Sequence, residues 1–147
     1  SARLYICGFG YYEAYINGKR VGNSVLDPGW TAHREQVLYS VYDVTELLKS
    51  GNNVAAVMLG NGWYNPLPIR LFREYNLRDY QQTGRPVLKA QIRLLYTDGS
   101  VETISTDESW KTTPGPVTRN NVYLGEKYDA RLEVNNWNRS GANLYSW

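Results

Sequence analysis

The chain has 147 residues, of which 42% are hydrophobic and 20% charged, with a formal net charge of +2. This length and composition predict a single globular domain over residues 1–147 with a sizeable core. Sixteen basic and fourteen acidic residues are interspersed without a basic run, so we expect neither nucleic acid nor a membrane as a partner. No stretch is long and apolar enough to span a membrane.

Ser1 leads directly into a strand pattern, and no signal peptide precedes it. We therefore expect the chain to be a fragment of a longer protein, whose localisation cannot be read from this sequence. Cys7 is the only cysteine, which excludes an intramolecular disulfide, and we expect it to be a small buried residue. His33 is the only histidine, which excludes a multi-histidine metal site and leaves one candidate base for a catalytic triad. His33 lies in a polar loop without a nucleophile-elbow context.

The aromatic residues are thirteen Tyr and five Trp against only two Phe. Rings with a polar atom suit hydrated recognition surfaces and sugar contacts. They also suit the cores of β-rich proteins, so the composition leaves both interpretations open.

The first part of the chain predicts strands. Residues 3–8 and 11–16 alternate in polarity and are rich in β-forming side chains. Asn17-Gly18 between 11–16 and 19–22 is the strongest short hairpin signal in the sequence.

A turn is predicted at Asp27-Pro28-Gly29, where Pro presets φ and Gly permits a positive φ. Asp27 and the adjacent Trp30 are candidate substrate-binding residues, because a carboxylate and a large ring together suit a sugar. A structural corner with no ligand is the alternative.

A second group of elements follows. Residues 36–42 alternate and predict another strand. Asp43 or Thr45 can then cap a short helical turn that Gly51 is placed to end. The apolar run at 53–59 is typical of a buried strand.

Residues 60–85 form a long segment without a clear period, and loops of this length are usually functional or disordered. The aromatic content argues against simple disorder. Its four arginines most simply indicate a solvent-exposed loop or an interface with a neighbouring domain. Binding of anionic sugars is the alternative. These aromatic and basic residues are Trp63, Tyr64, Phe72, Tyr75, Tyr80, Arg70, Arg73, Arg78 and Arg85.

The stretch GNGWY at the start of this segment is the main candidate binding site. Its glycines allow close backbone approach, Asn61 offers both a donor and an acceptor, and Trp63 and Tyr64 offer an aromatic platform. We predict substrate binding by Asn61, Trp63 and Tyr64. The alternative is a tight bend in which Trp63 closes the end of the fold or contacts the rest of a larger enzyme.

The remaining chain predicts further hairpins. Residues 86–96 form a long strand that Asp98-Gly99 turns into 100–106. Residues 117–134 supply one or two more strands, and the tail at 135–147 is loosely ordered. Eight to ten short strands with at most one or two helical turns predict an all-β, antiparallel β-sandwich of jelly-roll type.

A calcium site is a further hypothesis, because Asp107, Glu108 and the backbone of 110–114 carry hard oxygen atoms. The sequence has no known calcium-loop spacing, and no cofactor is required by any motif. On a strand Asp107 and Glu108 would point to opposite faces, which is poor geometry for paired catalysis.

Glycoside hydrolysis needs two carboxylates that flank the scissile bond. Glu126 and Asp129 are better spaced for this than Asp107 and Glu108, but Lys127 and Arg131 favour a local ion pair instead. We therefore do not expect this chain alone to be catalytic.

Seven phrases in a fixed order resemble the N-terminal β-sandwich domain of bacterial α-L-rhamnosidases, within the broader galactose-binding-like type of sandwich. The resemblance covers residues 3–134. The phrases are GYYEAYINGKRVG, VLDPGWT, VYDVTELLKSGNN, VMLGNGWY, YTDGS, TDESWK and GEKYDAR.

The resemblance implies an accessory domain of a bacterial, periplasmic or secreted hydrolase that removes terminal α-L-rhamnose from glycosides. Catalysis would lie in a separate helical toroid of the same parent chain, with two carboxylates that are absent here. Rhamnose or rhamnosides are then the implied partners, since some sandwiches of this type bind rhamnose with calcium. The alternative is a packing module without its own ligand, with exposed apolar area around residues 63–80 and the C-terminal tail.

Overall fold

The computed structural model describes residues 1–67, 70–71, 75–143 and 147. The described part is nearly all β, and every strand pairs antiparallel. None of its helices is long and apolar enough to cross a membrane. The strands are β1 (Ala2–Phe9), β2 (Tyr11–Ile16), β3 (Lys19–Arg20), β4 (Ser40–Asp43), β5 (Ala55–Gly60), β6 (Arg70–Leu71), β7 (Tyr75–Asn76), β8 (Val87–Leu95), β9 (Val101–Ser105), β10 (Val117–Asn121) and β11 (Gly125–Tyr128). The helices are η1 (Thr45–Leu47), α1 (Leu77–Tyr80) and η2 (Ala130–Leu132).

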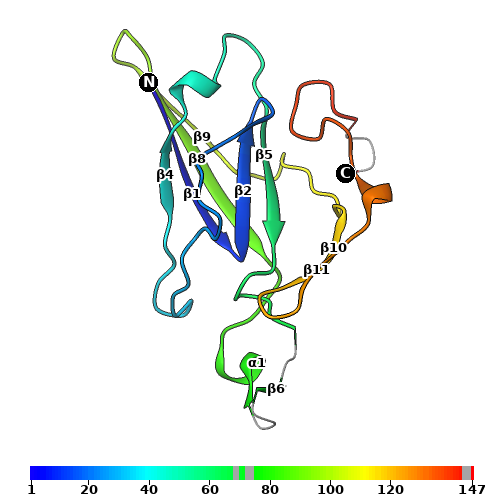
Figure 1. The fold of residues 1–147 in the computed structure, drawn as a ribbon. Coiled ribbons are helices and arrows are strands. Elements are labelled where there is room, and N and C mark those ends of the chain that lie inside the picture. The colour runs from blue at the N-terminus through cyan, green and yellow to red at the C-terminus, as the bar shows by residue number, and fades with distance from the viewer. Residues whose placement is uncertain (68–69, 72–74, 144–146) are drawn as a thin grey trace.

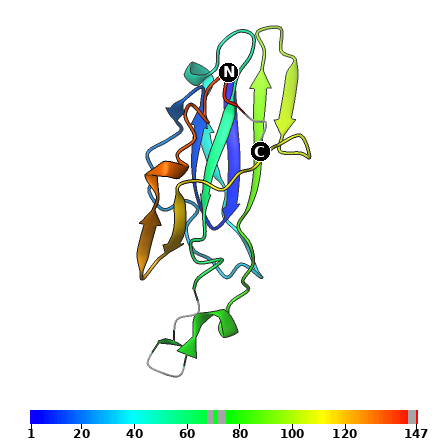
Figure 2. The ribbon, with the colours of Figure 1, turned by 90° about the vertical axis from the view of Figure 1, so that its right-hand side faces the viewer.

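Two sheets face each other and form the sandwich. One has the order β4-β1-β8-β9 and the other β3-β2-β5. Figures 1 and 2 show these layers, with the β10–β11 hairpin beside the second sheet. The longest pairing joins β1 to β8 from Ala2↔Leu94 to Phe9↔Val87. The predicted antiparallel sandwich is therefore confirmed, whereas the jelly-roll connectivity stays a prediction.

The core lies between the inner faces of the two sheets. Successive side chains of a strand point to opposite faces, so alternate residues of β1 and β2 are buried. Burying one large aliphatic side chain stabilises the fold by about 2 kcal/mol. Cys7 lies on the outer face of β1 and is only half-buried, unlike the buried residue we expected. The core residues are Ala2, Leu4, Ile6, Tyr12, Ala14, Ile16, Val21, Val44 and Ala90.

Both predicted hairpins are present. Asn17 and Gly18 have φ of 53° and 81° between β2 and β3, as a turn with two left-handed residues requires. Gly99 has φ of 85° in the turn between β8 and β9. The bounds predicted for β1, β2 and β8 agree with the structure to within two residues.

Three predictions for the middle of the chain were wrong in detail. The strand expected at 36–42 is β4, which begins only at Ser40 because β1 pairs with no earlier residue. The helical turn ends at Leu47, well before Gly51. The predicted buried strand β5 is half-buried, because it lies at the edge of its sheet.

The bend at Asp27 also differs from the prediction. The Asp27–Pro28 peptide is cis, and Gly29 is not among the glycines with positive φ. Asp107 and Glu108 follow β9 in a turn, so the expected opposite-face arrangement on a strand does not apply.

Residues 60–85 leave the end of the sandwich as an excursion, which carries β6, β7 and α1 and projects beyond the two sheets in both views (Figures 1 and 2). The segment predicted as irregular therefore contains a short hairpin and one helical turn. Phe72 and Arg73 lie outside the described residues. The Gly84 N–H donates to the Tyr64 carbonyl oxygen at 3.2 Å, which joins the two ends of the excursion.

Candidate functional site: an aromatic platform at the end of the sandwich

Three aromatic rings from separate connections meet at the end of the sandwich, and we call Trp30, Trp63 and Tyr123 the aromatic platform. The Trp30 and Trp63 rings are stacked, with centroids 4.7 Å apart and an interplanar angle of 16°. Tyr123 meets Trp63 edge-on at 5.5 Å and 83°. Such rings offer flat apolar faces on which the apolar face of a sugar can rest.

Exposure differs across the aromatic platform. Trp30 and Tyr123 are more than half exposed, whereas Trp63 is half-buried between them. Trp63 also hydrogen-bonds the Tyr11 side chain; burial raises the pKa of Tyr11, and this hydrogen bond opposes the rise. The Trp63 ring therefore packs partly against neighbouring side chains, whereas the Trp30 ring is exposed to solvent.

The GNGWY stretch makes a tight bend against the start of β2. Gly62 has φ of 52°, and a methyl group added to it would lie 2.9 Å from the Tyr11 backbone nitrogen. Only glycine fits this combination of left-handed φ and close backbone approach. The bend holds Trp63 in the position from which it stacks on Trp30.

Asn61 ties this bend to β10. Its N–H donates to Asn120 Oδ1 at 2.8 Å, and its Nδ2 donates to the Asn120 carbonyl at 3.2 Å. Its Oδ1 accepts from Asn65 Nδ2 at 2.8 Å. The Asn61 amide is thus engaged inside the protein, and it holds together the two connections that carry Trp63 and Tyr123.

Tyr64 packs against two other rings, those of Phe9 and His33. Its ring lies 4.8 Å from the Phe9 ring and 5.3 Å from the His33 ring. A methyl group on Gly84 would lie 2.8 Å from the Tyr64 hydroxyl oxygen. Partial burial in this cluster lowers the pKa of His33. The described geometry gives His33 aromatic neighbours and supplies no triad around it.

An open groove of about 320 Å³ flanks Trp30. One wall is the segment from Trp30 to Glu35, and the other is Tyr80 at the end of α1 with Gln81 and Gln82 after it. This volume lies at the small end of typical ligand sites, and the wall offers amide, hydroxyl and charged groups. The groove and the exposed Trp30 ring together form an open surface that combines an aromatic ring with polar groups.

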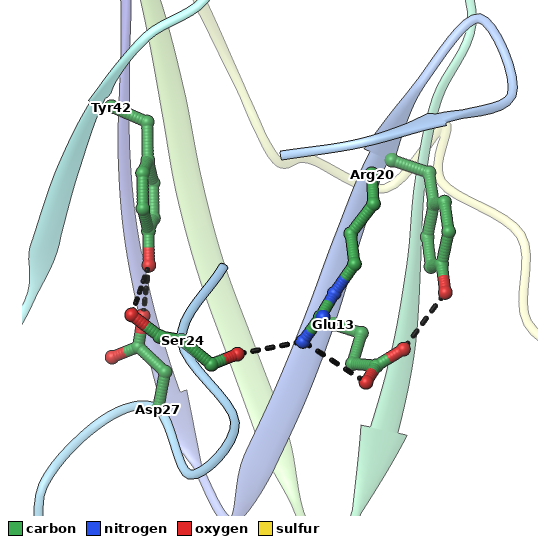
Figure 3. A network of polar contacts seen from close by, with 6 residues as sticks. Glu13, Arg20, Ser24, Asp27 and Tyr42 are labelled. Carbon is green, nitrogen blue, oxygen red and sulfur yellow. Dashed lines mark hydrogen bonds and ion pairs between the residues drawn. The ribbon is translucent and has the colours of Figure 1, made fainter. Parts of the chain in front are cut away.

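Asp27 is buried and serves as an anchor. Its Oδ2 accepts hydrogen bonds from the hydroxyls of Tyr12, at 2.7 Å, and of Tyr42, and its Oδ1 accepts from Ser40 Oγ at 2.7 Å. Figure 3 shows Asp27 and Tyr42 in this network. Burial and, secondly, the hydrogen bond to Asp27 raise the pKa of Tyr12. The carboxylate therefore links both sheets to the loop that carries Trp30.

The described residues do not gather a calcium site at Asp107. Its Oδ1 already accepts from the N–H and hydroxyl of Ser109, and both hydrogen bonds lower the pKa of Asp107. Over the described ranges, no three His, Cys, Asp or Glu side chains come together. Calcium prefers six to eight oxygen ligands, and this turn does not fit such a set.

Asp129, one of the two carboxylates considered for catalysis, is engaged in a local ion pair. Asp129 caps η2 and pairs with Arg131 at 2.5 Å, and its hydrogen bonds with Arg131 lower the pKa of the carboxyl. Glu126 is exposed on β11. The local ion pair expected as the alternative is therefore the observed arrangement for Asp129.

Of the five predicted substrate-binding residues, the structure brings Trp30 and Trp63 together. Asn61 and Asp27 hold the surrounding loops, and Tyr64 packs in a separate cluster. The sequence analysis named Tyr80 among the aromatic residues of 60–85 but did not single out Tyr123, Gln81 or Gln82. Tyr123 lies within residues 117–134, for which one or two strands were predicted, and its contact with Trp63 joins residues far apart in sequence.

Known proteins similar to this chain share one description. The family model for the α-L-rhamnosidase N-terminal domain matches residues 1–147. An α-L-rhamnosidase of Formosa agariphila is 40% identical over 100% of this chain and 15% of its own length. The solved α-L-rhamnosidase from Dictyoglumus thermophilum is 44% identical, with a TM-score of 0.86 over 99% of this chain and 15% of that chain.

A second solved structure is the Streptomyces avermitilis α-L-rhamnosidase complexed with L-rhamnose. It is 38% identical, with a TM-score of 0.88 over 99% of this chain and 14% of that chain. This chain thus spans about 15% of the length of the relatives it matches. With the sandwich and the full-length match in agreement, the chain belongs to the family of α-L-rhamnosidase N-terminal domains.

Proposed function

We propose that this chain is a non-catalytic carbohydrate-recognition domain of an α-L-rhamnosidase, whose parent enzyme hydrolyses terminal α-L-rhamnose. The observation that carries the proposal is the stacked pair Trp30–Trp63 beside a polar groove. A rigid ring supplies contact area at low entropic cost, and nearby polar groups supply orientation for hydroxyls.

Rhamnose or a rhamnoside is the proposed ligand. Support comes from family membership and from the related Streptomyces avermitilis enzyme, which was solved in complex with L-rhamnose. Trp30 would contact the apolar face of the sugar, and Gln81, Gln82 and Thr31 would meet its hydroxyls. Asn61, Trp63 and Asp27 would hold this surface in shape.

Titration with L-rhamnose tests the proposal. We expect millimolar or tighter binding, read as NMR shifts that cluster at residues 30–35, 63 and 80–82, with glucose as the matched control sugar. Calcium is included as a separate arm, because calcium-assisted binding remains a prediction from the resemblance. Absence of shifts at high rhamnose concentration, with and without calcium, would refute the binding role.

Substitution of the two tryptophans separates contact from packing. We expect Trp30→Ala to weaken rhamnose binding at least about tenfold with little loss of stability, because its ring is exposed. Trp63→Ala should lower both binding and the free energy of unfolding, because its half-buried ring packs on two others. Tyr39→Ala, which removes an exposed ring elsewhere, is the control. Unchanged affinity in Trp30→Ala would place the ligand elsewhere.

A second candidate function is packing against the rest of the parent enzyme, including its catalytic domain. The relatives are about six to seven times longer than this chain, since it covers only 15% of them. A silent rhamnose titration with an intact fold would favour this function.

A further inference from the structure

Three cationic side chains lie on the outer face of the four-stranded sheet, on its two central strands. These strands, β1 and β8, run side by side (Figure 1). Directly paired residues of neighbouring strands point to the same face of a sheet. We call Arg3, Lys89 and Arg93 the cationic face. The pairs on this side of β1 and β8 are Arg3↔Arg93, Tyr5↔Gln91 and Cys7↔Lys89.

The cationic face is open to solvent. Burial alternates along both strands, so that Leu4 and Ala90 are buried, whereas Arg3, Lys89 and Arg93 are exposed. The three cationic side chains therefore point away from the core, and none of the described segments packs over them. A ligand can reach all three from the solvent.

Within the described residues, the cationic face has no ion-pair partner. Among the outward-facing residues of the four strands, Asp43 on β4 is the one acid, and it lies opposite Arg3. Its Oδ1 accepts a hydrogen bond from the Thr45 N–H at 3.0 Å, and the ion pairs of the described chain are formed by other arginines. Three cations against one carboxylate give this face a positive potential, which attracts anions.

Arg3 and Arg93 are directly opposite each other in neighbouring strands. The Cβ atoms of such a pair are about 5 Å apart, and like charges in this position destabilise a sheet. Two guanidinium groups at this spacing can hold one carboxylate between them, because each presents a fork of N–H donors. Lys89 lies about 13 Å from Arg93 along β8, so it can contact a second acidic group of the same ligand.

Neutral polar side chains surround the cationic face. Gln91 lies between Lys89 and Arg93 on β8, and Thr103 and Ser105 of β9 pair with Arg93 and Gln91. Their amide and hydroxyl groups both donate and accept hydrogen bonds, as sugar hydroxyls require. Positive charge interleaved with such groups favours an acidic sugar over a phosphate polymer or an acidic peptide.

We propose that the cationic face binds a polysaccharide that carries carboxylates, that is, one built in part from uronic acids. Arg3 and Arg93 hold one carboxylate between them, Lys89 contacts a second, and the neighbouring amide and hydroxyl side chains orient the sugar hydroxyls. The choice of a glycan rests on the proposed function, in which the parent enzyme acts on glycosides, and on family membership. The site shares no residue with the aromatic platform.

Binding of defined oligosaccharides to the full-length parent enzyme tests the proposal. The probes are oligogalacturonate and oligomannuronate, and the control is methyl-esterified oligogalacturonate, which has the same backbone without the charge. We expect calorimetry to detect an acidic probe and to show at least about tenfold weaker binding of the ester, because hydrogen bonds to charged groups are stronger than neutral ones. Added salt should weaken binding of the acidic probe, since it screens exposed charges.

Two double substitutions remove the same charge from different places. Arg3→Gln with Arg93→Gln should weaken binding of the acidic probe at least about tenfold without lowering the melting temperature, because it also relieves a like-charge pair. Arg119→Gln with Lys127→Gln is the matched control, since these two cations are also directly opposite, but on the β10–β11 hairpin. The control pair should change the affinity less than about twofold. In the wild-type enzyme, the acidic probe should lower deuterium uptake at residues 2–9 and 87–95.

Every other outcome overturns the proposal. Failure of both acidic probes to bind, or equal binding of the ester, means that carboxylates are not recognised. Unchanged affinity in the Arg3→Gln, Arg93→Gln variant places the probe elsewhere on the enzyme, and equal losses in the two double variants indicate a response to net charge alone. Equal binding of inorganic polyphosphate indicates a general anion surface. Titration with neutral L-rhamnose is a separate measurement that this variant should leave unchanged, so failure of either proposal can be distinguished from failure of the other.

Discussion

At the scale of single residues, Asp27 has the most consequential environment. A buried carboxylate is costly unless its oxygens are paired, and here three hydroxyls donate to it from both sheets. Asp27, which we predicted from the sequence to bind a sugar, is thus a buried acceptor of several hydrogen bonds. The loop that bears Trp30 depends on it.

Asp27→Ala is predicted to destabilise the domain by about 3 kcal/mol, because it leaves three buried or partly buried hydroxyls without their acceptor. Urea unfolding at pH 7 measures the change. Glu108→Ala, which removes an exposed carboxylate, should stay within about 0.5 kcal/mol. Equal changes in unfolding free energy for the two variants would show that the hydrogen-bond network around Asp27 does not stabilise the domain.

His33 gives the domain a specific response to pH. Desolvation lowers its pKa in the folded state, so the unfolded chain binds the proton more strongly. The stabilising contribution is therefore fully present above the unfolded pKa of about 6.5 and is lost as pH falls through that value toward the folded pKa.

NMR titration of the imidazole resonances checks this prediction, since the chain has a single histidine. We expect the pKa of His33 to lie below 6.5 and to rise toward it in Tyr64→Ala, which opens the cluster to water. His33→Gln should remove this part of the stability loss on acidification. A pKa at or above 6.5 in the wild-type domain would contradict the burial argument.

At the scale of elements, Gly10 and Gly60 set how closely β2 and β5 approach each other. Gly10 has φ of 109°, and a methyl group on it would lie 2.2 Å from the Gly60 carbonyl oxygen. Both the backbone conformation and the space therefore require glycine at the junction of β1 and β2. The bend that carries Trp63 begins at this contact.

Gly10→Ala is predicted to cost about 3 kcal/mol or more of unfolding free energy, because strain and a backbone clash act together. Gly99→Ala has a similar φ of 85° but open space around it, so it should cost only about 1 kcal/mol. Chemical denaturation of both variants measures the difference. A cost for Gly10→Ala no larger than for Gly99→Ala would exclude the clash as the cause.

Local sequence patterns predicted the elements that depend on local chemistry. Alternation and the Asn17-Gly18 turn located β2 and its hairpin, and Asp98-Gly99 located the turn after β8. Alternation also predicted β4, but four residues too early, because a strand begins where a partner is available. The short hairpin within 60–85 has two-residue strands, which are too brief for a period to appear.

At the scale of the whole molecule, the candidate site joins regions that sequence proximity does not connect. Trp30, Trp63 and Tyr123 come from three loops, and each was visible in the sequence only as one aromatic residue among many. The resemblance to a family predicted the class of the protein and the sandwich. The stack itself required the folded structure, since neither Trp30 nor Trp63 carries a local sign of the other.

The domain alone is predicted to release no nitrophenol from a nitrophenyl α-L-rhamnoside. An inverting or retaining hydrolase needs an acid with a raised pKa beside a second carboxylate. The described carboxyls with a resolved change, such as Asp43 and Asp129, have a lowered pKa. A spectrophotometric assay of residues 1–147, with the full-length enzyme as positive control, checks this; turnover by the domain would overturn its non-catalytic assignment.

The two ends of the excursion at residues 60–85 are joined to each other, which affects how this segment can vary between related proteins. Gly84 and Tyr64 are joined by a backbone hydrogen bond, and Arg78 donates to Asn65 Oδ1 at 3.0 Å and to the Pro66 carbonyl at 2.8 Å. A segment with joined ends can be lengthened, shortened or exchanged without altering the sheets. Because Tyr80, Gln81 and Gln82 line the groove, such an exchange changes the wall facing Trp30 and leaves the supporting core intact. The sandwich thus provides a constant frame on which a change in this one segment reshapes the proposed binding surface.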